Sequence, residues 1–193
     1  MHVQTVQPTS LAVPINEVKE YLAISGNDDD SMVQRLIFQA ADFIESRTKT
    51  AIMSQTWALH TDGWTDSRYW IEGAIQIARA PFGSVSSITY LDSDGTQQTL
   101  AASEYRVAAP GIYARVSPAK NVSWPTTYGV TSDVTITHTC GYSDQSSVPY
   151  VIRQAVKDYC DAVFNRRSQG LTREVLEQLD ASTATAGAKV AYG

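Results

Sequence analysis

The segment from Pro81 to Val107 constrains the fold most, because it contains two strand-type runs separated by a turn. The turn is Asp92-Ser93-Asp94-Gly95, and its glycine supplies the backbone freedom that a tight chain reversal needs. Apolar residues are mixed with Ser, Thr and Gln on both sides of the turn, which is typical of a hairpin with one wet face. Because an isolated hairpin is only marginally stable in water, another part of the chain must cover its apolar face.

Two amphipathic helices are predicted, one on each side of the strand-rich middle. The first runs from Asp30 to Arg47 and the second from about Val148 to Arg167, and a shorter helix is expected over Ile15 to Leu22. The apolar stripe of the first helix has the spacing of a buried face and consists of Val33, Leu36, Ile37, Ala40, Ala41 and Ile44. We therefore expect these helices to cover the hairpins.

The remaining patterns complete the predicted fold class. Period-two alternation predicts further strands at 56–61, 75–77, 105–107, 112–116 and 134–140. The class is α+β: amphipathic helices packed with antiparallel β-hairpins, with a flexible N-terminal arm and an extended C-terminal tail. We place one domain at 1–169, including the arm at 1–13, and the tail at 170–193. The tail is too poor in bulky side chains to form a core, so we expect it to order only on a partner.

Composition excludes several classes of function. The chain has 193 residues, a formal net charge of -5 and no long cluster of Lys and Arg, which disfavours nonspecific binding to nucleic acid. Neither a signal peptide nor an apolar run of about 20 residues occurs, so no membrane association is expected. The two cysteines, Cys140 and Cys160, are expected to remain reduced and buried, in a soluble protein made in a reducing cytoplasm.

The residues that are able to carry chemistry form no convincing site. Asp28-Asp29-Asp30 suggests either a metal site or a helix cap, and we favour the cap because the spaced oxygens of a calcium loop are missing. His138 and Cys140 share one strand face, but two residues make neither a zinc site nor a catalytic centre. Asp92 and Asp94 are ordinary turn formers. We predict no enzyme activity, no cofactor and no metal.

Contact surfaces are better candidates than catalytic ones. Trp64, Tyr69 and Trp70 lie in one loop, where exposed aromatics would mark a contact surface; folding back onto the sheet is the commoner alternative. The candidate interface residues are Trp64, Tyr69, Trp70, Asp92, Asp94, Leu176, Leu179, Val190 and Tyr192.

The order of short motifs between about Leu11 and Arg167 resembles the head–tail connector, or adaptor, proteins of long-tailed double-stranded DNA bacteriophages and prophages. Each motif is weak alone, but their order and spacing together are specific. After the short helix at 15–22, they are Phe43–Thr48, Ser54–Trp57, Arg79–Pro81, Ser87–Asp92 with Asp94-Gly95, Tyr105–Val107, Ser123–Pro125, Thr139–Tyr142, Val148-Pro149, Gln154-Ala155 and Asn165–Arg167.

This resemblance implies a structural protein of the virion neck, assembled in the host cytoplasm. Such proteins form a ring, usually a dodecamer, under the portal protein; the ring extends the DNA channel and is the platform for a downstream neck or tail protein. DNA would pass without sequence-specific binding, and the negative net charge agrees with a conduit. The loop from Asp62 to Gly73 and the tail after Gly170 depart from the commoner form, and we expect the tail to order on the portal or a neighbouring subunit. The alternatives are another neck or tail-completion component and, less favoured, a small hydrolase using His138, Cys140 or the Asp pair.

Overall fold

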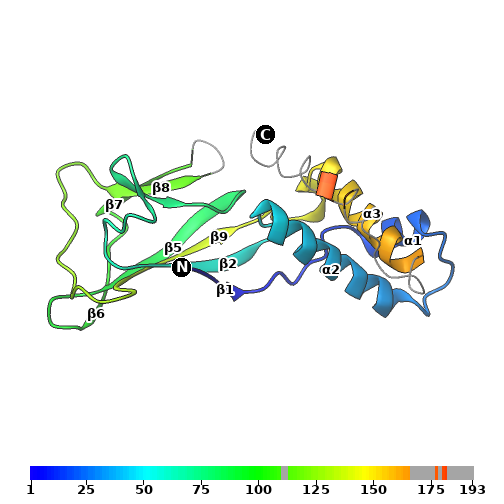
Figure 1. Ribbon diagram of the computed structural model, residues 1–193, viewed down its shortest axis with the longest axis horizontal. Coiled ribbons are helices and arrows are strands. Elements are labelled where there is room, and N and C mark those ends of the chain that lie inside the picture. Colours follow the sequence, from blue (N-terminus) through cyan, green and yellow to red (C-terminus); the bar gives the residue numbers. More distant parts are fainter. Residues whose placement is uncertain (110–112, 166–176, 178–179, 182–193) are drawn as a thin grey trace. The chain divides into compact units, whose positions relative to one another are not determined.

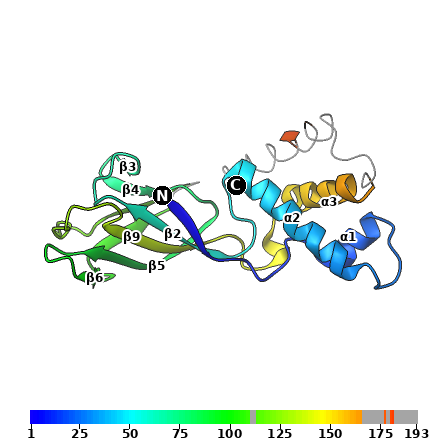
Figure 2. The same cartoon turned by 60° about the horizontal axis from the view of Figure 1, so that its bottom comes forward.

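A computed structural model describes residues 1–109, 113–165, 177, 180 and 181, and the chain forms two compact units. Unit 1 contains residues 1–7 and 55–140, and unit 2 contains residues 8–54 and 141–193 (Figures 1 and 2). The chain thus starts in unit 1, builds half of unit 2, returns to unit 1 and ends in unit 2. The predicted boundary between residues 169 and 170 lies outside the described residues and stays a prediction.

Unit 1 contains a five-stranded antiparallel sheet that includes the predicted central hairpin. Its strand order is β1 (His2–Val6), β2 (Gln55–Thr61), β9 (Val134–Cys140), β5 (Phe82–Leu91) and β6 (Gln97–Thr99). Strand β9 lies between β2 and β5 in the middle of the sheet, as Figure 2 shows. Its side chains alternate between buried and half-buried, which confirms the predicted alternation along this strand.

A second antiparallel sheet covers the apolar face of the hairpin. Its order is β3 (Trp70–Ile71), β4 (Ala74–Ile77), β8 (Ala114–Pro118) and β7 (Tyr105–Ala108). One buried cluster combines residues of the first sheet with residues of the second, namely Leu59, Ile88, Val134 and Ile136 with Ile75, Ile77, Ala114 and Val116. The expectation that helices cover the hairpins is therefore corrected, because two half-apolar sheets bury each other instead.

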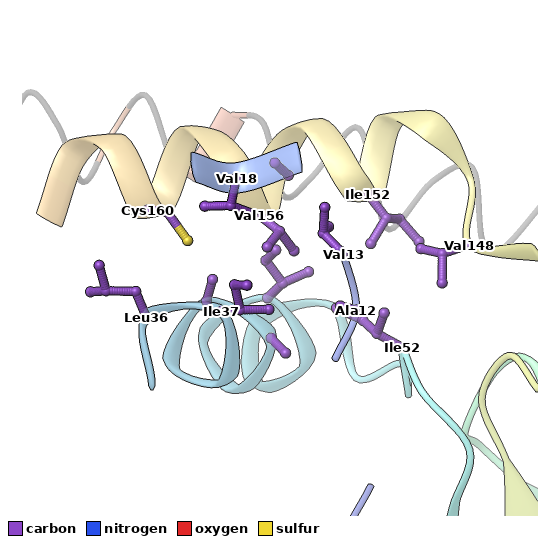
Figure 3. Close-up of a cluster of buried hydrophobic side chains, with 14 of the residues drawn as sticks. Ala12, Val13, Val18, Leu36, Ile37, Ile52, Val148, Ile152, Val156 and Cys160 are labelled. Carbon is purple, nitrogen blue, oxygen red and sulfur yellow. The ribbon is translucent and has the colours of Figure 1, made fainter. Parts of the chain in front are cut away.

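Unit 2 is built from helices α1 (Ile15–Tyr21), α2 (Asp30–Thr48) and α3 (Tyr150–Asn165), with a 3-10 turn η1 (Gln145–Ser147) before α3. The predicted stripe of α2 is buried against α1 and α3, and Figure 3 shows α1 and α3 on one side of this core and α2 on the other. Burying each Val, Leu or Ile side chain of this stripe contributes about 1.5–3 kcal/mol. The mixed α+β class is confirmed, with the two kinds of element segregated into separate cores.

Two local expectations are corrected. The N-terminal arm is extended, but residues 2–6 are not free, because they pair with β2 and so satisfy the backbone groups at that edge of the sheet. In the aspartate run, Asp29 precedes α2 without a side-chain cap bond. Asp30 instead accepts a hydrogen bond from Lys19 Nζ at 2.5 Å, because the ammonium group of the buried Lys19 competes for the carboxylate.

The prediction that both cysteines are buried is confirmed. Cys140 and Cys160 are both buried, and burial raises the pKa of the Cys160 thiol to about 12. No helix in the described part of the chain is long and apolar enough to cross a membrane.

Candidate interaction surface

The aromatic loop between β2 and β4 folds back onto the sandwich core. The Trp64 side chain is only 7% exposed; its indole N–H donates to the Pro125 carbonyl at 2.8 Å, and its ring stacks on Trp124 with centroids 4.5 Å apart. Trp70 is half-buried in strand β3, opposite Ile75. Trp64 therefore folds back onto the sheet, the alternative to an exposed contact residue. Its role is to join two loops inside unit 1.

Tyr69 lies between the loop and the N-terminal strand. Its ring stacks on His2 at 6.0 Å, and the Arg68 guanidinium lies 5.7 Å from the ring centroid. Arg68 also binds the carboxylates of Asp62 and Asp66, which holds the pKa of Asp66 well below its usual range. This network orders the part of the loop that remains exposed.

The turn between β5 and β6 is ordered by one carboxylate. Asp92 accepts hydrogen bonds from the backbone N–H groups of Asp94 at 3.0 Å and Thr96 at 2.9 Å, and from Gln98 Nε2 at 2.8 Å. The Gln98 bond and the two backbone bonds lower the pKa of Asp92. Gly95 has φ +77°, the left-handed conformation expected for a glycine in such a turn. Asp92 is thus a turn former, and Asp94 is exposed beside it.

A second loop completes the end of this hairpin. The Tyr128 ring lies 3.7 Å from the position that a Cβ would take at Gly95, and Tyr128 N–H donates to the Leu91 carbonyl at 3.1 Å. Tyr128 is 54% exposed and Val130 is also exposed. We call Asp92–Gly95 with Tyr128 and Val130 the hairpin-tip surface. Tyr128 was not among the predicted contact residues, and the signal for it in the sequence was an aromatic residue next to a glycine in a polar loop.

The buried carboxylate of Asp133 fixes the second loop. It accepts hydrogen bonds from the backbone N–H groups of Gly129 at 2.5 Å and Val130 at 3.0 Å, while the Asp133 carbonyl accepts from Leu91 N–H at 3.0 Å. The hairpin-tip surface is therefore held in one conformation before any partner binds, which reduces the entropy lost on association.

The histidine and the cysteine considered for catalysis are inaccessible. His138 and Cys140 share one face of β9, as predicted, but both are buried, and burial lowers the pKa of His138. His138 lies 5.7 Å from His2 between ring centroids, a neighbour that the sequence did not indicate. No group of three or more His, Cys, Asp or Glu side chains suited to a metal ion occurs in the described ranges.

The other predicted contact residues, Leu176, Leu179, Val190 and Tyr192, lie outside the described residues. The expectation that the tail orders on a partner stays a prediction.

Comparison with known proteins identifies the fold. The sequence matches no family model and no curated protein at a significant level. Among solved structures, a chain in the neck of an empty gene transfer agent (GTA) particle, computed with C6 symmetry, has a TM-score of 0.72 at 20% identity, covering 93% of this chain and 94% of that one. A chain in the virion of the native particle has a TM-score of 0.75 at 20% identity, covering 100% and 96%. A chain in the native neck, computed with C12 symmetry, has a TM-score of 0.68 at 20% identity, covering 93% and 94%. The protein shares its fold with these chains over nearly their whole length.

Proposed function

We propose that this protein is a structural component of the neck of a tailed, phage-like particle, where copies of it form a ring. The observation that carries the proposal is the fold shared with chains of GTA particles, two of them from the neck, over at least 93% of this chain. The sequence resemblance to head–tail connectors supports the same role through separate features, the order and spacing of short motifs.

Ring formation is supported by symmetry and by surface chemistry. The two neck structures were computed with C6 and C12 symmetry, as expected when identical subunits surround one axis. A closed ring needs two different complementary faces on each subunit. The hairpin-tip surface fits a contact with a neighbour, because it combines an exposed tyrosine and valine with an acidic turn in a preformed loop.

The finer role that we propose is that of an adaptor. The ring would bind the portal protein on one side and a downstream neck or tail protein on the other, and it would extend the DNA channel between them. A formal net charge of -5 suits a conduit, because a strongly basic lumen would hold the DNA through its phosphates. The described residues give the rival hydrolase no support, since the His138–Cys140 pair is buried and Asp92 is occupied by its turn.

The test is to delete the gene from a producing strain and to locate a tagged copy in particles by electron microscopy. An adaptor should lie directly beneath the portal, and its deletion should leave heads without tails. Normal tailed particles after deletion would overturn the neck role. A tagged copy farther along the tail axis would favour the alternative, another neck or tail-completion component.

A further inference from the structure

We propose that the outer face of α1 and α3 in unit 2 docks on the outer face of α2 of a second copy, and that this contact repeats around the ring. The inference rests on the proposed function, because it requires a ring of identical subunits. Beyond the ring itself, it specifies which helical surfaces of neighbouring copies meet and which residues form the contact.

Two exposed tyrosines mark the first surface. In the described part of unit 2, only Tyr21 and Tyr150 are large hydrophobic side chains with high exposure, at 45% and 65%. The ammonium group of Lys157 lies 5.6 Å from both ring centroids, so one buried cation links the two rings. Exposed tyrosines gathered in one patch are typical of interface cores, because each offers a large rigid area with a polar tip.

A continuous network fixes this patch. Lys157 donates to Glu17 at 3.0 Å, and Gln154 donates to Asp158 at 2.8 Å. The Tyr21 hydroxyl donates to Asp158 at 2.9 Å, and this bond is the main cause of the raised pKa of Tyr21. Because both helices hold these side chains in place, association would cost little further conformational entropy. We call Tyr21, Tyr150, Glu20 and Asp158 the tyrosine face.

The opposite side of unit 2, formed by α2, exposes a guanidinium group that complements the tyrosine face. The core of unit 2 separates α1 and α3 from α2, so their solvent faces point in opposite directions (Figure 3). The outer face of α2 exposes Arg35 together with Asp42 two turns further on, and Lys49 follows at the C-terminal end, so the cations outnumber the acid there. A guanidinium group stacks on tyrosine rings and binds carboxylates, so Arg35 of one copy suits the Tyr21, Tyr150 and Asp158 side chains of the next.

This arrangement meets the geometric requirement for a ring. The two faces differ and lie on opposite sides of the helical core of unit 2, so the contact is heterologous and repeats from one copy to the next. A two-fold dimer would instead need one self-complementary patch, and the tyrosine face carries exposed carboxylate that would meet its own like charge.

Cysteine cross-linking in assembled particles tests the contact. The variant that carries both Tyr150→Cys and Arg35→Cys should give a ladder of covalent multimers with a short bis-maleimide, whereas each single variant should give none. The native thiols do not interfere, because Cys140 and Cys160 are buried. The matched control pairs Arg35→Cys with Tyr113→Cys, another exposed tyrosine, which lies in unit 1.

The outcomes separate this inference from the proposed function, because the tagged protein is located in the same particles. A neck location without the ladder, or an equal ladder from the control pair, would overturn the contact and leave the neck role standing. Cross-linking of Tyr150→Cys to a different protein would also overturn it. Absence of the protein from the neck would overturn both proposals.

A charge exchange gives a second measurement. Arg35→Glu and Glu20→Lys should each lower the yield of tailed particles about tenfold, and the double variant should restore most of it, because the opposite charges meet again. Both residues are exposed, so folding should be unaffected, and far-ultraviolet circular dichroism checks this. A double variant no better than the worse single variant would contradict the pairing.

Discussion

The two units solve the same problem, the burial of polar groups, by different chemistry. Unit 2 buries two lysines, each paired with a partly exposed carboxylate of a neighbouring helix: Lys19 with Asp30 and Lys157 with Glu17. Unit 1 holds its buried Asp133 carboxylate with backbone N–H groups and also buries imidazoles, because Nε2 of His2 and of His138 are both buried and have no hydrogen-bond partner among the described residues. All three histidines of the chain lie in unit 1. The units should therefore respond differently to substitution and to pH.

The largest expected effect on stability is at a glycine with positive φ, and it is measured against a second such glycine in the other unit. Gly141 of unit 2 has φ +98°, and a Cβ there would lie 2.2 Å from the Met53 carbonyl oxygen, whereas a Cβ at Gly95 of unit 1 would meet only the Tyr128 ring at 3.7 Å. Gly141→Ala should cost about 4 kcal/mol or more, and Gly95→Ala about 1 kcal/mol. Urea unfolding measures both, and equal costs would contradict the close backbone approach at Gly141.

The next comparison removes equivalent volume from each core. Ile37 in unit 2 and Ile136 in unit 1 are both fully buried, so each change to Ala should cost about 3 kcal/mol. Amide hydrogen exchange should report faster opening of α2 and α3 for Ile37→Ala, and of β2, β5 and β9 for Ile136→Ala. A uniform acceleration across both units in either variant would mean that the chain unfolds as one cooperative body.

Acidification should separate the units without any substitution. Burial, and next the neighbouring His138, lower the pKa of His2 from 6.5 to about 4, and burial lowers the pKa of His138. The unfolded chain then binds more protons than the folded chain between these values. The histidine contribution is complete above pH 6.5 and is lost as the pH falls towards 4, by about 2 kcal/mol after allowance for the partial exposure of His2.

Hydrogen exchange at pH 7 and at pH 4.5, corrected for the intrinsic exchange rate, measures this loss in each unit. His138→Gln should flatten the pH dependence of unit 1. His60→Gln is the matched control, because His60 is only half-buried and bonds Thr135 at 2.9 Å. An acid-induced loss confined to unit 2, which has no histidine, would contradict the assignment.

The smallest effect is expected at the hairpin turn. Asp92→Ala removes the acceptor of three hydrogen bonds and should lower the melting temperature by a small amount, whereas Asp94→Ala should leave it nearly unchanged. Thermal unfolding measures both. If Asp94→Ala leaves stability unchanged but lowers the yield of tailed particles, the hairpin-tip surface is a contact; an unchanged yield would return Asp94 to the role of turn residue.

Local patterns in the sequence predicted where helices and strands form better than they predicted which of these elements pack or pair with each other. The alternation in β9 and the stripe of α2 each follow from the period of one element, and both are confirmed. The prediction that the helices cover the hairpin was wrong, because two amphipathic helices and a second half-apolar sheet are equally able to bury an apolar face. The pairing of β1 with β2 joins residues about fifty positions apart, which local spacing does not encode.

The candidate surface shows the same difference between features set by local sequence and features set by contacts between distant segments. The turn from Asp92 to Gly95 was predictable from its residue types. The burial of Trp64 depends on Pro125 and Trp124, and the position of Tyr128 depends on Gly95, so both required knowledge of which loops meet. The link between Tyr21 and Tyr150 through Lys157 likewise joins two helices that are distant in sequence.

The central position of β9 has a consequence for synthesis on the ribosome. Both β2 and β5 pair with β9, so neither the main sheet nor the hairpin that depends on it is complete until the last strand has been translated. Helix α3, which closes the other core, follows within about ten residues. A nascent chain therefore acquires both folded units almost together and late, so incomplete chains present no finished surface with which to enter an assembling particle.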